Sequence, residues 1–439
     1  MKKLILSILI IFLCLTSFML ISCGGEDDTT TAEPPADYSI TYQLNGGTNS
    51  IKNPDTYKTG EIITLDYPEK ADYMFAGWFT DSALTTEIKE IKDKEENLTL
   101  YAKWIPYDDV FEFYEGTEYY SIRIAPDYEV ETIIIPSKYN NLPVTKILSL
   151  FKGKYESVKA VIVPDSVISI DLYALVDGSI EGNVNLSYIG VDSNNPYFKS
   201  VDGVLYSKDG KILIKYPPCK GGSSFTVPEG VESVNEYAFA RNKNLKNVII
   251  PNTVTSIGIR AFMFSETLED IVIPNSVTKV EYAAFSKCKS LRSIILSNSM
   301  ESIEHNTFES CSALGSIVIP ESVKEIKSWA FDGCSALESI KLSNGLTTIG
   351  YGAFHNCTLL KSIEIPDNTT TIQNMAFSNC TSLESIVIPD SVSTVEVIAF
   401  HTCPNLTIYC EAESKPEGWD ENWCVGAKEV VWGHKESNK

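Results

Sequence analysis

The sequence predicts a mainly β protein, in which a solenoid of 23-residue repeats with short helical or 3₁₀ turns follows a small β domain. Two regular spacings predict the solenoid: a phenylalanine recurs every 23 residues, and a leucine follows each phenylalanine by six. The positions are Phe239, Phe262, Phe285, Phe308, Phe331, Phe354, Phe377 and Phe400, with Leu245, Leu268, Leu291, Leu314, Leu337, Leu360, Leu383 and Leu406. The length of 439 residues also predicts more than one folded unit.

The chain begins with a basic segment followed by an apolar one. Two lysines precede Leu4–Ile21, which is about as long as a membrane span. The sequence LISC that ends at Cys23 resembles a bacterial lipobox, which implies cleavage before Cys23 and a diacylglycerol group on its sulfur. Residues 1–22 are then a lipoprotein signal peptide. A plain secretory signal and an uncleaved membrane anchor are the alternatives.

Residues 23–37 are expected to form a flexible acidic tether. The sequence GGEDDTTTAEPPAD has no apolar residues that could form a core, and its prolines and like charges favour an extended chain. A lipid with two or more acyl chains on Cys23 would hold the tether, and the folded parts beyond it, stably at a membrane.

Residues 38–104 are expected to form a small β domain. Alternating apolar residues in ITYQL predict a half-buried strand, Asn45-Gly46-Gly47 predicts a turn, and YMFAGWFTD and LTLYAKW predict further strands. The combination of ITYQLNGG, FAGWFT and LYAKW resembles the Listeria–Bacteroides repeat, the B repeat of internalin-type surface proteins. This resemblance implies a β-grasp-like fold and a location on the bacterial surface.

Each regular repeat follows the pattern C-x-x-L-x-x-I-x-I-P-x-x-V-x-x-I-x-x-x-A-F. Leu383, Ile386 and Ile388 are expected to point inward from a strand, and Pro389 marks its end because proline cannot donate a strand hydrogen bond. Valine, isoleucine, serine and threonine dominate the repeats, and no stretch has a long helical stripe. The repeats therefore predict strands on two faces, joined by short turns.

The regular repeats at 239–408 follow less regular ones at 131–238, and we expect caps at 105–130 and 409–439. The segments SLESIVIPDSV, AFSNC, NNPYFKSVDGVLYSKDGKILI and YCEAESKPEGWDENW together resemble the BspA-like leucine-rich repeats of bacterial surface proteins. The predicted fold is therefore a leucine-rich-repeat solenoid. The resemblance implies adhesion to extracellular-matrix proteins or to other cells, with no implied ligand.

Six cysteines share one place in the repeat, three residues after the phenylalanine: Cys288, Cys311, Cys334, Cys357, Cys380 and Cys403. In a solenoid they would stack in a straight row, which cannot converge on a zinc ion and directs the thiols in parallel. Asn242 and Ser265 take the same place in earlier repeats, so we expect small buried residues that fill a tight corner. Cys410 and Cys424 in the C-terminal cap are the candidates for a disulfide in an exported protein.

One outward row of the first strand is unusually apolar. The tenth residues after the phenylalanines are Ile249, Val272, Ile295, Val318, Lys341, Glu364 and Val387. Solvent-facing strand positions are usually polar. Two interpretations remain open: the β propensity of a regular ladder, or an exposed apolar stripe suited to contact with a protein.

The composition and motifs exclude several classes of function. A formal net charge of −22 disfavours nucleic acid as a partner. The sequence has no G-x-S-x-G, H-E-x-x-H, P-loop or EF-hand pattern, so we expect no catalytic residues, metal, cofactor or small-molecule substrate.

The sequence as a whole therefore predicts a binding protein held at the bacterial cell envelope by lipid. It would lie on the outer membrane or on the outer face of the cytoplasmic membrane, and its partner would be a protein of a host cell, a neighbouring cell or the extracellular matrix. The alternatives are a structural spacer and an enzyme that acts on surface polymers.

Overall fold

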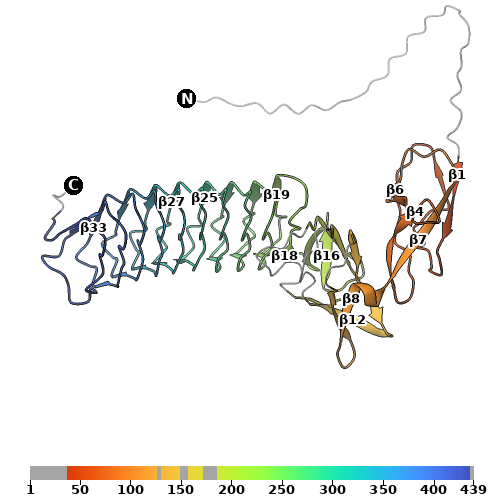
Figure 1. Cartoon of the computed structure of the whole chain (residues 1–439), viewed down its shortest axis with the longest axis horizontal. Coiled ribbons are helices and arrows are strands. Elements are labelled where there is room, and N and C mark those ends of the chain that lie inside the picture. Colours follow the sequence, from red (N-terminus) through yellow and green to blue (C-terminus); the bar gives the residue numbers. More distant parts are fainter. Residues whose placement is uncertain (1–36, 126–129, 149–156, 172–184, 436–439) are drawn as a thin grey trace, which may run out of the picture.

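The computed structural model describes residues 37–125, 130–148, 157–171 and 185–435. The expected signal peptide, Cys23 and all but the last residue of the expected tether lie outside these ranges. In the described ranges the regular secondary structure consists of short β-strands and one short helix, α1 (Tyr107–Val110). Figure 1 shows a long solenoid with a small separate domain at its N-terminal end. The mainly β solenoid predicted from the 23-residue period is confirmed.

The small N-terminal domain contains seven strands. They are β1 (Asp37–Gln43), β2 (Thr56–Lys58), β3 (Ile63–Thr64), β4 (Tyr73–Phe79), β5 (Glu87–Ile88), β6 (Glu90–Ile91) and β7 (Leu98–Pro106). Five of them form a sheet in the order β2-β1-β7-β4-β5, in which the first and last long strands, β1 and β7, run parallel. Trp78 is 3% exposed in the core of this domain.

Each repeat forms one turn, or rung, of the solenoid. The irregular rungs, which the less regular repeats form, have one sheet on each side. One side holds β10 (Thr132–Ile134), β13 (Ala160–Val163) and β15 (Tyr188–Val191), which pair in parallel. The other side holds β8 (Phe111–Glu115), β9 (Tyr120–Ile124), β11 (Lys138–Tyr139), β12 (Leu142–Ile147) and β14 (Ser169–Ile170). Three further strands, β16 (Phe198–Val201), β17 (Val204–Ser207) and β18 (Ile212–Lys215), pair as antiparallel neighbours before the regular rungs begin.

The regular rungs continue both sides with parallel strands. The first side, called here the strand face, holds β19 (Ser224–Thr226), β21 (Asn247–Ile249), β23 (Asp270–Val272), β25 (Ser293–Ile295), β27 (Ser316–Val318), β29 (Ser339–Lys341), β31 (Ser362–Glu364), β33 (Ser385–Ile388), β35 (Thr407–Cys410) and β36 (Glu429–Val431). The second side holds β20 (Ser233–Val234), β22 (Ser256–Ile257), β24 (Lys279–Val280), β26 (Ser302–Ile303), β28 (Glu325–Ile326), β30 (Thr348–Ile349), β32 (Thr371–Ile372) and β34 (Thr394–Val395).

The repeated phenylalanines stack at one corner of the solenoid. From Phe239 to Phe400 the ring centroids of successive rungs lie 4.8 to 5.8 Å apart, with interplanar angles of 3 to 17°. Each ring is at most 1% exposed. Each buried phenylalanine contributes about 1.5–3 kcal/mol of transfer free energy, so this column is a large part of the core.

The corner that carries these phenylalanines differs from the expected helical turns. In each regular rung, two residues have positive φ angles: the residue two positions before the phenylalanine and the residue two positions after it. A right-handed helix does not accept such angles. Apart from Gly333 and Gly352 these residues are Tyr237, Arg241, Arg260, Phe264, Ala283, Lys287, Asn306, Ser310, Trp329, Asn356, Met375, Asn379, Ile398 and Thr402. The chain therefore turns by separate hydrogen-bonded turns.

This unusual backbone directs amide groups along the solenoid axis. In the rung of Phe262, the N–H groups of Arg260, Phe262 and Phe264 all donate to carbonyl oxygens of the following rung, at 2.9, 2.7 and 2.9 Å. A left-handed residue costs about 1–2 kcal/mol, and the inter-rung hydrogen bonds offset that cost. These corner bonds form a third ladder between rungs, in addition to the two sheets.

Each end of this corner ladder has a cap. At the C-terminal end, the N–H groups of Ile398 and Phe400 donate to the carbonyl oxygens of Asn422 and Trp423, which belong to the last segment of the chain. At the start of the regular rungs, the buried Lys215 ammonium donates to Tyr237 O at 2.8 Å and to Ala240 O at 3.5 Å. Both caps give polar groups at the ends of the ladder a hydrogen-bond partner, and Tyr237 O also accepts the N–H of Ala240 at 3.1 Å.

Candidate binding face

The apolar row predicted on the strand face lies in solvent. Ile249, Val272, Ile295 and Val318 end successive strands β21, β23, β25 and β27, and their side chains alternate with the buried residues of the same strands. Their exposed fractions are 53, 55, 59 and 62%. Four such residues on neighbouring rungs form one continuous apolar stripe, called here the binding face.

The rest of the predicted row does not continue this stripe. Lys341 and Glu364 are exposed charged residues at the ends of β29 and β31. Val387 on β33 is half-buried and pairs in register with Tyr409, whose ring lies 4.8 Å from that of His434. The structure therefore brings four of the seven predicted residues together in one apolar stripe. Lys341 and Glu364 differ from the stripe in being charged, and Val387 lies beside the C-terminal cap.

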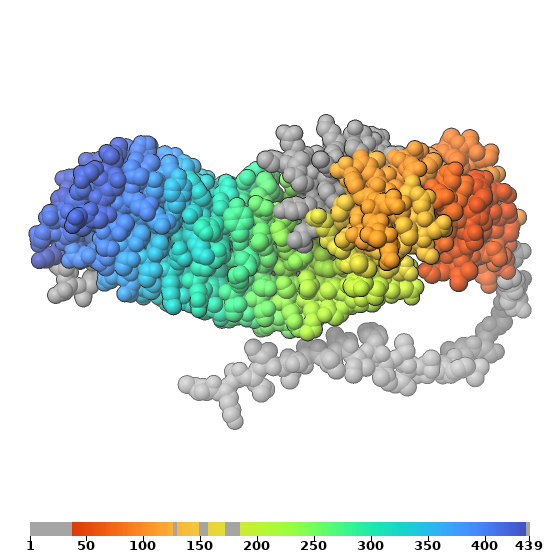
Figure 2. Space-filling view, turned by 90° about the horizontal axis from the view of Figure 1, so that it is seen from below, coloured from red at the N-terminus to blue at the C-terminus, as the bar shows by residue number. Residues whose placement is uncertain are grey.

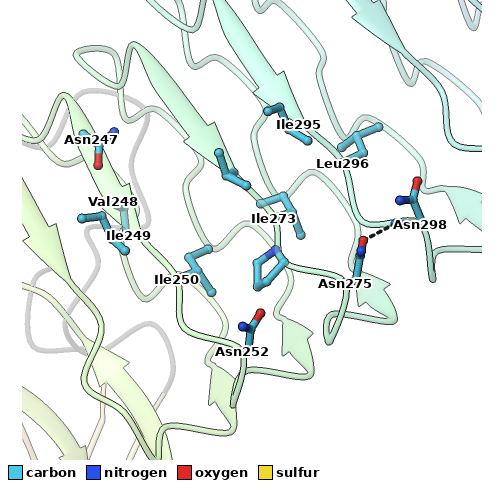
Figure 3. Close-up of a pocket in the computed structure, with 12 residues that line it drawn as sticks. Asn247, Val248, Ile249, Ile250, Asn252, Ile273, Asn275, Ile295, Leu296 and Asn298 are labelled. Carbon is cyan, nitrogen blue, oxygen red and sulfur yellow. Dashed lines mark hydrogen bonds between the residues drawn. The ribbon is translucent and has the colours of Figure 1, made fainter. Parts of the chain in front are cut away.

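A shallow groove of about 520 Å³ lies beside the apolar stripe. The twelve residues that line it include no charged side chain, although the protein contains 58 acidic and 36 basic residues. Figure 3 shows Ile249 and Ile295 on one side and Asn252, Asn275 and Asn298 on the other. Asn275 Oδ1 accepts a hydrogen bond from Asn298 N at 2.9 Å, which holds the Asn275 amide against the next rung.

The three asparagines were not predicted from the sequence. They recur 23 residues apart, three residues after Ile249, Val272 and Ile295, so the same period that predicted the solenoid could have identified them. Glu321 takes this place after Val318. Amide side chains both donate and accept hydrogen bonds, and a partner would meet neutral polar groups beside apolar ones.

Charged residues border the other side of the stripe. Lys246 Nζ lies 2.9 Å from Glu269 Oε1 across one rung, and this hydrogen bond, helped by the charges of Lys246 and Arg292, lowers the pKa of the Glu269 carboxyl. Lys246 is 60% exposed, so the pair adds little to stability, about 0–1 kcal/mol. Its position suits a role in orienting a partner rather than in holding the fold.

The six stacked cysteines are fully buried free thiols, each 0% exposed. Each Sγ lies within hydrogen-bonding distance of the carbonyl oxygen of the phenylalanine in the preceding rung, at 3.1 to 3.3 Å. Ser265 Oγ makes the same bond to Phe239 O at 2.7 Å. The row therefore contains hydrogen-bond donors as well as small side chains, and burial raises the pKa of its thiols.

Cys410 and Cys424 are both free thiols in this structure, so the disulfide predicted between them is not formed here. Burial, and then the charge of Cys424, raises the pKa of Cys410 to about 12. A thiolate is the species that attacks in disulfide formation, and this environment disfavours it.

Histidines and carboxylates do not gather in a metal site within the described ranges, where no group of three or more His, Cys, Asp or Glu residues could hold an ion. His355 Nδ1 lies 2.8 Å from Asp332 Oδ1, a contact between neighbouring rungs that the sequence analysis did not anticipate.

The repeats match a described protein family. Residues 216–337 and 301–413 match the BspA type leucine rich repeat region, in six copies. The regular rungs are a BspA-type leucine-rich repeat region. Residues 38–103 match the Listeria–Bacteroides repeat domain, so both resemblances seen in the sequence are confirmed.

Solved structures and curated proteins show similarities to this chain. A leucine-rich repeat protein of Eubacterium ventriosum has 21% identity and a TM-score of 0.45, covering 72% of this chain and 97% of that one. A leucine rich cell surface protein of Faecalibacterium prausnitzii has 23% identity and a TM-score of 0.39, covering 74% and 95%.

A Gly-rich membrane protein of Evansella cellulosilytica is 29% identical over 122 residues, which are 27% of this chain and only 13% of that relative. In the parts of the chain that the structure describes, no helix has the length and apolar character needed to cross a membrane.

Proposed function

We propose that this protein is a bacterial cell-surface lipoprotein that binds a protein partner, without catalysis, through the binding face. The observation that carries the proposal is the continuous stripe of Ile249, Val272, Ile295 and Val318, each more than half exposed. Apolar residues near the centre of an interface usually supply most of its binding energy. The asparagine row beside the stripe offers neutral polar contacts to the same partner.

The proposed partner is a protein on a host or neighbouring cell or in the extracellular matrix. Cys23, carrying lipid, would attach the protein to the outer membrane or to the outer face of the cytoplasmic membrane. The similarity to a cell surface protein and to a membrane protein supports this location. The acidic composition supports a protein partner over a nucleic acid.

Two other candidate functions have less support. A spacer that only holds another component away from the membrane would be served by a uniformly polar strand face, and the stripe does not fit that requirement. An enzyme acting on surface polymers would need a catalytic group, and leucine-rich repeat proteins generally serve binding.

The experiment replaces Ile249, Val272, Ile295 and Val318 with serine in the full chain. The side chains point away from the core, so no cavity forms, and strand propensity changes by about 1 kcal/mol or less per site. Binding to a panel of immobilised matrix proteins, measured by surface plasmon resonance, should fall at least tenfold for any ligand that the parent binds.

The control is Ile317→Ser, an inward change on the same strand as Val318. Ile317 is 4% exposed, so serine leaves a void and buries a hydroxyl, and the melting temperature should fall. If the variant with the four outward serines binds every ligand as the parent does, the stripe is only a β ladder and the adhesive surface lies elsewhere.

A further inference from the structure

The position of the apolar row can be followed back into the irregular rungs, where it holds Ile134 and Ile162, before Gly190 and Thr226 interrupt it ahead of Ile249. Ile134 on β10 stands two residues before Pro136, as Ile249 stands two residues before Pro251. β10 pairs in parallel with β13 just as β21 pairs with β23, and both belong to the strand face. Ile134 is therefore the counterpart of Ile249 in the irregular rungs.

Ile134 already contacts another domain. Its side chain is half-buried and packs against the hydrophobic cluster of the N-terminal domain, because β4 of that domain lies against β10. Met74 of β4 is 1% exposed and belongs to the cluster of the irregular rungs. In Figure 2 the N-terminal domain, in red, abuts the first rungs, in orange to yellow.

Charged residues border this contact as they border the binding face. Glu131 precedes β10 and forms ion pairs with Lys159, at 2.6 Å, which precedes the next strand, and with Lys89 of the N-terminal domain. In the regular rungs, Lys246 and Glu269 precede neighbouring strands β21 and β23 and form an ion pair at 2.9 Å.

The molecule thus carries the same combination twice: outward apolar residues of the strand face with a glutamate–lysine pair at their border. One copy is covered by a β domain and the other is exposed. The chain's own domain cannot cover both, because β7 continues into α1 without a linker and Met74 is buried among the irregular rungs.

We propose, building on the proposed function, that the binding face docks a β-sheet domain of its protein partner. The partner domain presents an apolar strand to Ile249, Val272 and Ile295, as β4 does to Ile134. It places a lysine at Glu269, as Lys89 is placed at Glu131. The partner chemistry is therefore a sheet face of aliphatic and aromatic side chains with a cation at its border.

The N-terminal domain of this chain, residues 37–106, is a probe of that chemistry. Its two sheets use only its own strands, and its core contains Ile91, Leu100 and Trp78, which are 0, 0 and 3% exposed. It therefore has what it needs to fold alone, and a cooperative melt verifies this. When isolated, its β4 face is free.

The experiment titrates fluorescently labelled 37–106 with the full chain, whose own domain stays docked. We expect saturable binding with a Kd on the order of 100 μM, as suits a small interface. Val272→Glu with Ile295→Glu in the full chain should weaken binding at least tenfold. Lys341→Glu, on the same row outside the apolar stripe, should leave the Kd within about twofold.

A charge exchange tests the border contact. Lys89→Glu in the probe should weaken binding several-fold, and Glu269→Lys in the full chain should restore part of that loss. Absence of binding by a folded probe, or binding that Val272→Glu and Ile295→Glu do not weaken, overturns the docking proposal. If the four serine changes still abolish binding to a matrix protein, the proposed function stands without it.

Discussion

Replacing one buried cysteine, Cys334, distinguishes two roles of the cysteine row. Its Sγ is 3.1 Å from Phe308 O, and the residue is 0% exposed. If the position only demands a small side chain, alanine should be tolerated better than serine, because serine buries a hydroxyl. If the position demands a hydrogen-bond donor, serine should be tolerated better than alanine.

The contacts of Phe308 O set the size of the effect. This oxygen also accepts the N–H of Cys311 at 3.1 Å, so Cys334→Ala removes its second bond and does not leave it unpaired. We assign about 0.5–1 kcal/mol to that bond and about 1–1.5 kcal/mol to the space left by sulfur. Cys334→Ala should therefore destabilise the solenoid by about 1.5–2.5 kcal/mol, and Cys334→Ser by about 1 kcal/mol or less.

The assay is urea unfolding followed by circular dichroism, comparing midpoints at equal slope. Ser265→Cys is the matched control and should be nearly neutral, because it places at Ser265 the residue that six other rungs use. Ser265→Ala should lose about 1 kcal/mol. A Cys334→Ala protein at least as stable as Cys334→Ser would refute the donor role and leave only the demand for small size.

Three further predictions concern the corner ladder, a buried lysine and the anchor. Thr402 and Gly333 hold the same left-handed corner position, with φ angles of 57 and 70°. Thr402→Gly should therefore stabilise the protein by about 0.5–1 kcal/mol, and Gly333→Thr should destabilise it by about 1–2 kcal/mol. The same urea assay measures both changes. Burial, and then the charge of Arg241, lowers the pKa of Lys215 to about 7, so the folded state binds this proton more weakly than the unfolded state. The unfolding free energy of the parent relative to Lys215→Met should therefore rise between pH 7 and about 10.5 and stay level below pH 7, and denaturation at several pH values measures it. Cys23→Ala should move the protein from the detergent phase to the aqueous phase in Triton X-114 partitioning, and unchanged partitioning would indicate an uncleaved anchor.

Periodicity in the sequence was enough to predict the regular part of the fold. The eight phenylalanines predicted the stacked corner, and the alternation around Val318 predicted which side chains face solvent. The left-handed residues could not be predicted, because Trp329 and Ile398 have no intrinsic preference for positive φ. Hydrogen bonds to the next rung impose that conformation, and they exist only once the rungs have stacked.

The binding face was only partly predictable for a similar reason. The row from Ile249 to Val318 can be found from local alternation, without any contact to another domain. The relation to Ile134 depends on how the N-terminal domain packs, which is a tertiary property. Val387 was included in the row by its spacing, yet its neighbour Tyr409 belongs to the last strands, where the period is broken.

The corner ladder and the two sheets have a mechanical consequence for a surface protein under tension. Hydrogen bonds between successive rungs run along the solenoid axis, so a force applied to the two ends of the solenoid loads them in series. Rungs would detach from an end one after another at low force, as in unzipping. Each released regular rung would add about 71–78 Å of length, from 23 residues at roughly 3.3–3.6 Å each less one rung spacing of about 5 Å. A solenoid of this kind extends in steps, and its remaining rungs stay folded while it absorbs the pull.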